Sequence, residues 1–427
     1  MEITELYALF LSSHGITTDT RKIAPNQIYF ALKGDNFNGN KFAHSAIEQG
    51  AAFAVIDEAE YLQGQQYILV DNVLQTLQTL AHYHIKKINP KAIIAITGSN
   101  GKTTTKELVH AVLASTYKTH YTKGNLNNHI GIPITLLEME KGTEIAVIEM
   151  GANHQKEIES YCKYVEPTHG IITNCGKAHL EGFGGTQGIR KGKGELYDYL
   201  KQHQGTVFVN GDDTILLDMV KERNITASVS YGKNKLCTYS SKILVENPFL
   251  KILFDGIEIS SNLFGSYNFS NIMCAIAVGK YFGVTSAAIK SAIEAYNPTN
   301  ARSQMIDKNG YHLILDAYNA NPTSMQHALE SFAKSEAERK IVLLGDMFEL
   351  GDETTKEHQF IADLCTQLNF ETIVLVGKAF LQTTTPPAIL KFADNIAAKE
   401  WFQQQNFNGA TLLLKGSRGM KMELILS

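Results

Sequence analysis

The sequence predicts an α/β protein of three domains, with a central P-loop-type, mostly parallel sheet and a C-terminal Rossmann-like domain. Apolar runs of buried-strand type alternate with helical stretches, which is typical of a parallel sheet covered on both faces. The 427 residues are too many for one hydrophobic core. A glycine-rich loop near residue 98 joins one such strand to a helix, as in phosphate-binding proteins.

Prolines mark both predicted domain boundaries. Pro90 follows a helix-like stretch, and Tyr296-Asn297-Pro298 precedes a second series of strands. We therefore predict domains at residues 1–89, 90–298 and 299–427. The expected strands are 27–32 and 51–57 in the first domain, 91–97, 144–150, 169–174 and 205–210 in the second, and 311–319, 339–347, 371–378 and 409–417 in the third.

The segment ITGSNGKTTTK, residues 96–106, makes ATP the first hypothesis for a ligand. Gly98 and Gly101 permit a tight turn, so that backbone N–H groups and a helix N-terminus can point at phosphate oxygens. Lys102 adds a point charge for the terminal phosphates, and the Thr103 hydroxyl suits a magnesium ion. Ile96 stands where the usual G-x-x-x-x-G-K-[ST] pattern has its first glycine, so a narrower family explanation is needed.

Composition excludes several classes of protein. The net charge of −4 gives no basic field for nucleic acid. The five cysteines lie far apart without a C-x-x-C, which argues against a zinc ribbon or a disulfide framework and favours a reducing cytosol. No apolar run approaches the length of a membrane span, and the first residues carry no basic leader. We expect a cytoplasmic protein that is a monomer.

Polar side chains follow the predicted central strands, at the edge where ligands bind in open α/β sheets. Glu149 ends one strand, His179 lies a few residues after the next, and Asp212 and Asp213 follow a third. Carboxylate oxygens beside a phosphate loop suit a divalent cation such as magnesium. Each residue taken alone is equally well explained as a helix cap or a solvated side chain.

A series of segments resembles those of the Mur ligases, in the same order. They are TGSNGKTTTK, GNLNNHIGIP, EMGANHQKEI, TNCGKAHLEGFGG, KGELY, GSYNFSNIMCAIAVG, DAYNANPTSM, LLGDMFELG and LLKGSRGMKME. The resemblance runs from near Asp19 to near Glu423. It is strongest to the members that add D-alanyl-D-alanine to a UDP-N-acetylmuramoyl-tripeptide. The Asp-Asn-Pro-Arg signature typical of the sister ligase MurE is missing.

The resemblance implies a role for particular residues around ATP and two magnesium ions. Thr103 and Glu149 would bind the first ion, and His179 and a carbamylated Lys193 the second, with Lys102, Glu149, His179 and Lys193 as the catalytic set. Carbamylation turns the amine into an anionic oxygen ligand; Lys191 nearby leaves the register open, and a solvated helix lysine is the alternative. The implied ATP-binding residues are Gly98, Ser99, Asn100, Gly101, Lys102, Thr103, Thr104, Asn268, Arg302, Asp316, Tyr318 and Asn319.

The resemblance also implies where the other substrates bind. Thr20 and Arg21 would contact the UDP-sugar, Asn125 and Asn128 would position the substrate, and Lys415, Ser417 and Arg418 would receive the carboxylate of the dipeptide. Turn formation and helix capping are the alternatives for the asparagines and for Asp316. The chain departs from the family at Asn38-Gly39-Asn40, where Asp-Gly-His is frequent, and at His129, where aspartate is frequent.

The expected reaction is an ATP-dependent amide ligation through an acyl phosphate, in peptidoglycan precursor synthesis and hence in cell wall formation, cell shape and division. Two alternatives stay open. One is another ATP-dependent ligase, such as MurE or a folylpolyglutamate synthetase. The other is a non-catalytic nucleotide-binding protein, against which the intact set of Lys102, Glu149, His179 and Lys193 argues.

Overall fold

The computed structural model describes residues 1–299 and 301–427. Its contacts divide the chain into two compact units. One unit comprises residues 1–95, 117–151 and 157–169, and the other comprises residues 96–116, 152–156 and 170–427. The two predicted domain boundaries stay predictions, whereas the predicted α/β class with mainly parallel sheets is confirmed.

The N-terminal residues form a small parallel sheet with the strand order β1-β2-β5-β6. Tyr29, Ala54 and Ile56 from its strands pack with Ala43 and Ala46 in a common core. The elements of this region are α1 (Ile3–Ser12), β1 (Ile16–Thr17), β2 (Ile28–Phe30), β3 (Lys33–Gly34), β4 (Phe37–Asn38), α2 (Ala43–Glu48), β5 (Phe53–Ile56), β6 (Tyr67–Leu69) and α3 (Val73–Ile88).

The largest sheet has seven strands in the order β13-β12-β11-β10-β7-β9-β8. Its strand β7 is AIIAIT, and all six of its residues are buried, as expected for a strand covered on both faces. The elements are β7 (Ala92–Thr97), α4 (Lys102–Ala114), β8 (Thr119–Tyr121), α5 (Gly131–Leu137), β9 (Ile145–Glu149), α6 (Glu157–Val165), β10 (His169–Ile172), α7 (Leu180–Phe183), α8 (Thr186–Gln202), β11 (Thr206–Asn210), α9 (Thr214–Glu222), β12 (Ser228–Gly232) and β13 (Tyr239–Ser240).

An antiparallel sheet of three strands follows, which the sequence reading did not anticipate. It consists of β14 (Lys242–Val245), β15 (Phe249–Phe254) and β16 (Ile257–Phe264), with the order β14-β15-β16. Two helices come after it, α10 (Phe269–Tyr281) and α11 (Ser286–Ala295). Helix α10 is buried over almost its whole first three turns, because α4 and β12 pack against it.

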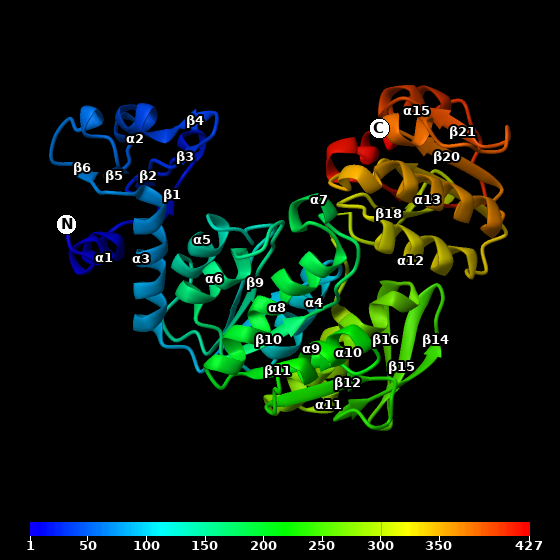
Figure 1. Cartoon of the computed structure of the whole chain (residues 1–427), viewed down its shortest axis with the longest axis horizontal. Helices are drawn as coiled ribbons and strands as arrows, with labels where there is room; N and C mark the ends of the chain where they lie inside the picture. Colours follow the sequence, from blue (N-terminus) through cyan, green and yellow to red (C-terminus); the bar gives the residue numbers. More distant parts are fainter. Residues whose placement is uncertain (300) are drawn as a thin grey trace. The chain divides into compact units, whose positions relative to one another are not determined.

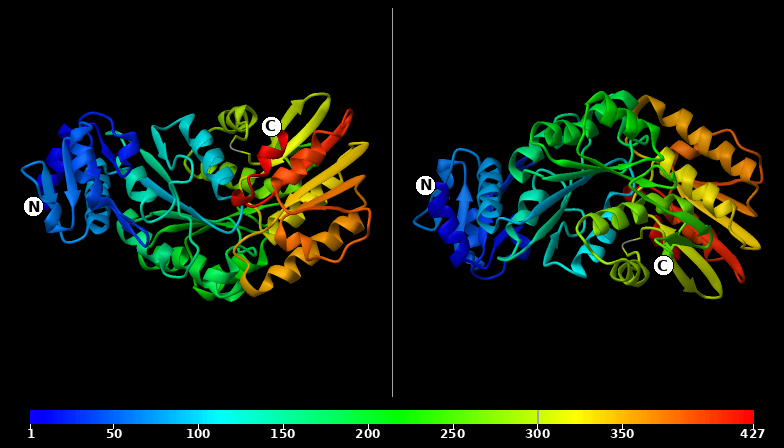
Figure 2. Two further views of the ribbon diagram at one scale, coloured as in Figure 1. Left: turned by 90° about the horizontal axis from the view of Figure 1, so that it is seen from above. Right: turned by 90° about the horizontal axis from the view of Figure 1, so that it is seen from below.

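The C-terminal sheet has the order β17-β18-β22-β19-β20-β21, with β17 antiparallel and the remaining strands parallel. Figure 1 labels most of its elements, and Figure 2 shows helices on both faces of the sheet. The elements are β17 (Gln304–Lys308), β18 (Tyr311–Asp316), α12 (Pro322–Ala333), β19 (Arg339–Gly345), α13 (Thr354–Leu368), β20 (Thr372–Val376), α14 (Lys378–Leu381), β21 (Leu390–Phe392), α15 (Asn395–Phe402) and β22 (Ala410–Lys415).

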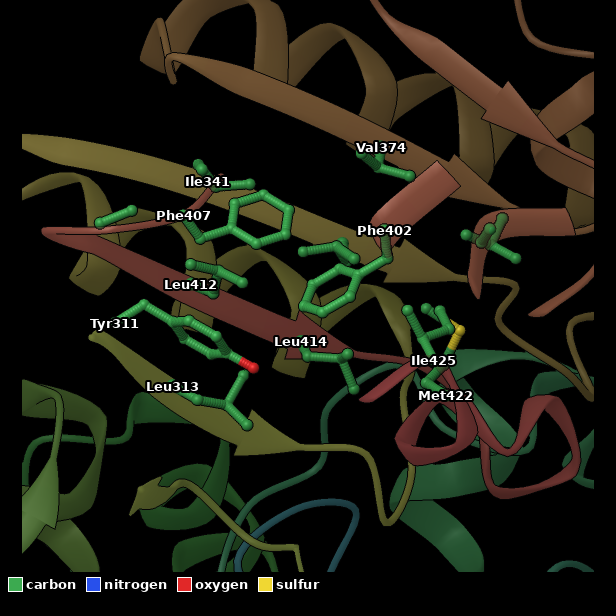
Figure 3. Close-up of a cluster of buried hydrophobic side chains, with 14 of the residues drawn as sticks. Tyr311, Leu313, Ile341, Val374, Phe402, Phe407, Leu412, Leu414, Met422 and Ile425 are labelled. Carbon is green, nitrogen blue, oxygen red and sulfur yellow. The ribbon is translucent and has the colours of Figure 1, made fainter. Parts of the chain in front are cut away.

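One face of this sheet carries a continuous apolar core. Figure 3 shows Leu414 of β22 beneath Phe402 of α15 and Leu412 beneath Phe407, with Met422 and Ile425 of the last turn nearby. Burying a side chain of this size contributes about 1.5–3 kcal/mol. The C-terminal turn is therefore anchored to the sheet by its own hydrophobic residues, and it fixes the chain directly after β22.

Candidate active site

The predicted phosphate loop is a turn in which two positions require glycine. Gly98 has a φ of +143° and Gly101 a φ of +78°. A Cβ at residue 98 would lie 2.0 Å from Thr173 Oγ1, and one at residue 101 would lie 2.7 Å from Asn271 Oδ1. Helix α4 begins directly after the turn, so that the positive end of its dipole faces the loop.

The residues after β10 brace this loop. Thr173 Oγ1 donates a hydrogen bond to Asn100 O over 2.6 Å, and Asn100 N donates to Asn174 Oδ1 over 3.1 Å. Ser99 Oγ donates to Gly176 O over 2.7 Å. The backbone conformation of the loop is thus held by its own protein neighbours, as a preformed phosphate cradle requires. Sequence reasoning missed Thr173 and Asn174, although they are the last two residues of a predicted strand.

The Lys102 ammonium lies over the loop. It donates to Gly98 O at 2.7 Å and to Ser99 O at 3.3 Å. Thr103 and Thr104 occupy the first turn of α4, and Thr103 is buried. The predicted loop residues from Gly98 to Thr104 therefore form one local arrangement, with a cation at its surface.

Two buried asparagines lie behind the loop. Asn271 accepts a hydrogen bond from Thr105 Oγ1 at 3.1 Å and donates to Asn268 Oδ1 at 2.8 Å. Asn268 in turn donates to Phe264 O at 2.8 Å. Asn268 is thus connected to the phosphate loop through Asn271, which sequence reasoning did not place in the site.

Glu149 is the last residue of β9, and it is only 1% exposed. Asn127 Nδ2 donates to Glu149 Oε1 over 2.8 Å, and Thr122 Oγ1 accepts from Glu149 N at 2.9 Å. Asn128, which was expected to position the substrate, accepts from the N–H groups of Ile130 and Gly131 at the start of α5. The asparagine that reaches the predicted metal ligand is therefore Asn127, which sequence reasoning missed.

His179 directly precedes the short helix α7 and has a φ of +53°. Its Nδ1 is hydrogen bonded to the carboxylate of Glu349, a residue of the LLGDMFELG segment. This hydrogen bond lowers the pKa of Glu349. In the sequence, Glu349 was noted only as part of a family segment. Its contact with His179 could not be predicted, because the two residues are 170 positions apart.

Lys193 lies on α8 and is 1% exposed, whereas Lys191 is exposed. The Nζ of Lys193 donates to Ala152 O over 3.0 Å and lies 4.8 Å from the centroid of the Phe183 ring. Phe183 N donates to His179 O at 3.1 Å, so that one turn of helix connects His179 to the neighbour of Lys193. Burial thus singles out Lys193, and not Lys191, as the lysine in a special environment.

Arg302 and Asp316 lie in the C-terminal part of the chain, as the resemblance implied. The Arg302 guanidinium stacks on the Tyr318 ring, 3.6 Å from its centroid. The buried Nε of Arg302 has no hydrogen-bond partner among the described residues. Asp316 accepts from Ser303 N at 3.1 Å and from Lys415 Nζ at 2.5 Å, and Lys415 also donates to Asn319 O at 3.2 Å.

The three residues expected to receive the dipeptide each contact different partners. Lys415 is buried against Asp316. Ser417 is also buried and accepts from Phe348 N at 3.0 Å. Arg418 is largely exposed and donates to Glu423 over 2.8 Å. Lys415 therefore joins the predicted ribose residue Asp316, and only Arg418 presents its charge to solvent.

Thr20 and Arg21 lie in a short turn of the N-terminal region. Arg21 is largely exposed, and its Nε donates to Asp19 Oδ1 over 2.8 Å. This hydrogen bond lowers the pKa of Asp19 to about 2. Asn40, at the position where the family frequently has histidine, is fully buried and exchanges hydrogen bonds with Asp57. Asn40 is thus part of the packing of this region.

The candidate metal ligands differ in how well they suit a magnesium ion. Among the residues that the structure describes, no group of three or more His, Cys, Asp and Glu side chains could hold a metal ion by itself. Magnesium commonly takes one or two carboxylates together with substrate phosphates and water, so a hydroxyl such as Thr103 and a carboxylate such as Glu149 suit it. The free amine of Lys193 does not suit magnesium, although a carbamate there would.

Among the described helices, none has the length and apolar composition of a membrane span.

Three family models match the chain in succession. Residues 12–96 match the Mur ligase family catalytic domain, residues 96–279 the Mur ligase middle domain, and residues 301–418 the glutamate ligase domain of Mur ligases. The matches cover the phosphate loop, Glu149, His179, Lys193 and Arg302.

Curated relatives and solved structures agree with these models. The chain is 33% identical to the UDP-N-acetylmuramoyl-tripeptide–D-alanyl-D-alanine ligase of Bacillus subtilis, covering 97% of this chain and 92% of the relative. It is 30% identical to the Escherichia coli ligase of the same name, over 99% of this chain and 95% of the relative. A crystal structure of MurF from Acinetobacter baumannii matches with a TM-score of 0.86 at 30% identity, covering 96% of this chain and 92% of that one. By these matches along nearly its whole length, the chain belongs to the Mur ligase family.

Proposed function

We propose that this protein is an ATP-dependent ligase that joins D-alanyl-D-alanine to UDP-N-acetylmuramoyl-tripeptide, in the cytoplasmic synthesis of peptidoglycan precursors. The observation that carries the proposal is the match, over 97% of the chain, to a relative that bears this name. The braced loop around Lys102 supports it independently, because it offers backbone N–H groups, a helix N-terminus and an ammonium to a phosphate chain.

Gly98 to Thr104 would hold the ATP phosphates, with Lys102 neutralising the terminal one. Asp316 would contact the ribose, Tyr318 and Asn319 would flank the adenine, and Asn268 would act from behind the loop. Arg302 would reach the phosphates. Its stacking on Tyr318 and its buried Nε without a partner support a ligand-facing role, because a buried guanidinium N–H costs free energy until it is hydrogen bonded.

Thr103 and Glu149 would hold one magnesium ion, and His179 with a carbamylated Lys193 a second. Magnesium supplies charge neutralisation at the transferring phosphoryl group. The 1% exposure of Lys193 supports the modification, because it sets this residue apart from the exposed Lys191 on the same helix.

The reaction follows from the charges of the two anions that must meet. The carboxylate of the tripeptide attacks the γ-phosphorus of ATP, ADP leaves, and an acyl phosphate forms. Lys102 and Arg302 reduce the repulsion between carboxylate and triphosphate. The free amine of D-alanyl-D-alanine then attacks the acyl carbon, and inorganic phosphate leaves the tetrahedral intermediate as the amide forms.

The remaining substrate contacts are proposed in three groups. Thr20 and Arg21 would bind the UDP-sugar, Asn125 and Asn128 would position the tripeptide, and Lys415, Ser417 and Arg418 would serve the dipeptide. The domains 1–89, 90–298 and 299–427 would carry UDP-sugar, ATP and dipeptide binding, respectively. Domain closure around the substrates would exclude water from the acyl phosphate, and the enzyme would act as a monomer.

The experiment that tests this function is product mass spectrometry of three parallel reactions with ATP and magnesium: UDP-N-acetylmuramoyl-tripeptide with D-alanyl-D-alanine, the shorter UDP-dipeptide with a diamino acid, and a folate with glutamate. We expect the amide product and ADP only with the tripeptide and D-alanyl-D-alanine. Product with a diamino acid on the shorter UDP-dipeptide would indicate MurE-type activity. Glutamate addition to a folate would indicate a folylpolyglutamate synthetase, and the absence of ADP with every amine would leave a non-catalytic nucleotide-binding protein.

A further inference from the structure

The loop that carries His179 is tied to the C-terminal segment at two points. Lys177 N donates to Thr323 Oγ1 over 3.0 Å, and Lys177 Nζ donates to the buried carboxylate of Glu357 over 2.5 Å. Two residues later, His179 Nδ1 is hydrogen bonded to Glu349. The position of the imidazole is therefore set by residues about 150 to 180 positions further along the chain.

Both partners of the His179–Glu349 contact have unusual backbones. His179 has a φ of +53° and Glu349 a φ of +63°, a left-handed conformation that is unfavourable for residues with a Cβ. Each is secured by a backbone hydrogen bond, from Phe183 N to His179 O at 3.1 Å and from Glu181 N to Glu349 O at 3.4 Å. A half-exposed ion pair contributes little to stability, so stability alone does not account for two strained residues facing each other.

The contact determines which imidazole nitrogen carries the proton. An ionised carboxylate only accepts hydrogen bonds, so Nδ1 must be the protonated nitrogen. In a neutral ring Nε2 then keeps its lone pair, which is the form that binds a metal ion. Metal-binding histidines regularly donate their second nitrogen to a carboxylate, which fixes both the tautomer and the orientation of the ring.

We propose that Glu349 is a positioning residue for His179: its carboxylate fixes the Nδ1–H tautomer and turns Nε2 toward the cation. This inference rests on the proposed function only for the identity of the cation. The hydrogen-bonded pair, the two left-handed backbones and the Lys177 contacts are properties of the chain itself. The C-terminal segment thereby takes part in shaping a site whose other residues come from the middle of the chain.

The test compares Glu349→Ala, Glu349→Gln and Glu349→Asp with the full-length wild type. Glu353→Gln is the matched control, because Glu353 lies in the same segment and accepts a hydrogen bond from the neighbouring Lys356 over 2.8 Å. Nitrogen-15 NMR of labelled histidine reports the tautomer, with the His179 signals assigned by their loss in His179→Gln. Manganese titration followed by electron paramagnetic resonance, with a non-hydrolysable ATP analogue, reports cation affinity.

We expect the His179 signals to change from the Nδ1–H tautomer to a mixture in Glu349→Ala, and manganese affinity to fall about 10-fold. Glu349→Asp should recover part of both, and Glu353→Gln should change neither. Unchanged His179 signals or unchanged manganese affinity in both Glu349→Ala and Glu349→Gln would overturn the inference. Wild-type ligation activity is measured separately: its absence, with the tautomer change present, would count against the proposed function and leave the role of Glu349 in place.

Discussion

Asn127 Nδ2 donates a hydrogen bond to Glu149 Oε1 over 2.8 Å, at the carboxyl end of β9. Glu149 is almost fully buried, and the space beside Asn127 is so tight that a Cβ on Gly151 would lie 2.9 Å from the side-chain Cγ. The carboxylate therefore has one fixed orientation, which a metal ligand needs.

We predict that Asn127→Ala lowers kcat/KM about 10-fold and raises the magnesium concentration needed for half-maximal activity, because Glu149 loses the donor that orients it. Steady-state kinetics across a magnesium series measures both. Lys123→Ala is the control, since Lys123 lies on the same loop and pairs with Glu138 at 3.0 Å. An unchanged magnesium dependence in Asn127→Ala would contradict the assigned role.

Removal of the Lys102 ammonium should reduce ligation by about 100-fold or more, because the charge that neutralises the transferring phosphate is lost. Lys102→Ala and Lys102→Arg are compared in an assay of ADP release, with circular dichroism as a check on folding. Arginine should not restore wild-type activity, since its planar fork differs from a compact ammonium. Near-normal activity in Lys102→Ala would remove the loop from the mechanism.

Lys193→Ala should abolish ligation while ATP binding is largely retained, and short carboxylates should restore part of the activity by supplying the missing oxygen ligand. Lys191→Ala is the matched control, two residues away on the same helix and exposed. Ligation rates with and without added acetate or formate measure the effect. Full activity of Lys193→Ala, or equal losses in both variants, would exclude a carbamate at residue 193.

Because Lys415 contacts Asp316, we expect substitutions of Lys415 and Arg418 to affect different substrates. We predict that Lys415→Met raises the KM for ATP, because it leaves the Asp316 carboxylate without its 2.5 Å partner. Arg418→Ala, which removes an exposed cation, should mainly raise the KM for D-alanyl-D-alanine. Initial rates with each substrate varied in turn decide between the roles. A larger effect of Lys415→Met on the dipeptide would return Lys415 to dipeptide binding.

Stability should fall as the pH is lowered from 7 to 5. Burial lowers the pKa of His169 from 6.5 to about 4, so that the unfolded chain takes up a proton through this range and the folded protein does not. The contribution of His169 to the free energy of unfolding is therefore fully present above pH 6.5, and it is lost as the pH falls toward 4. It amounts to roughly 2 kcal/mol between pH 7 and pH 5.

Urea unfolding at the two pH values measures this loss for the wild type and for His169→Gln. The glutamine variant should show a smaller loss by about that amount, whereas a variant of the exposed His14 should behave as the wild type. An identical pH dependence in His169→Gln would contradict the assignment to His169.

Much of the fold could be predicted from the sequence because apolar runs and glycine turns are local signals. The predicted strands 91–97, 339–347 and 371–378 contain β7, β19 and β20, each of which lies within the predicted bounds. The antiparallel sheet β14–β16 was missed, although burial alternates along β15; only β14, with its part-exposed KILV, lacks buried residues. Helix α10 is buried on nearly all sides because other elements cover it.

The site was predictable where a motif is local and not where it depends on distant pairs. The residues from Gly98 to Thr104 are contiguous, and their glycines and lysine identify them. Asn127, Asn271 and Glu349 act through side chains that meet residues 22, 166 and 170 positions away. Spacing along one sequence carries no signal for such contacts. Burial, which only the fold supplies, also separates Lys193 from Lys191.

The measurement that tests the central claim most directly follows oxygen-18 from a tripeptide substrate labelled in its terminal carboxylate. Mass spectrometry is applied to the products formed with ATP, magnesium and D-alanyl-D-alanine. An acyl phosphate requires that one labelled oxygen appears in inorganic phosphate and that one stays in the new amide, with one ADP formed for each amide. Unlabelled phosphate, or no amide product with the dipeptide, would contradict the account.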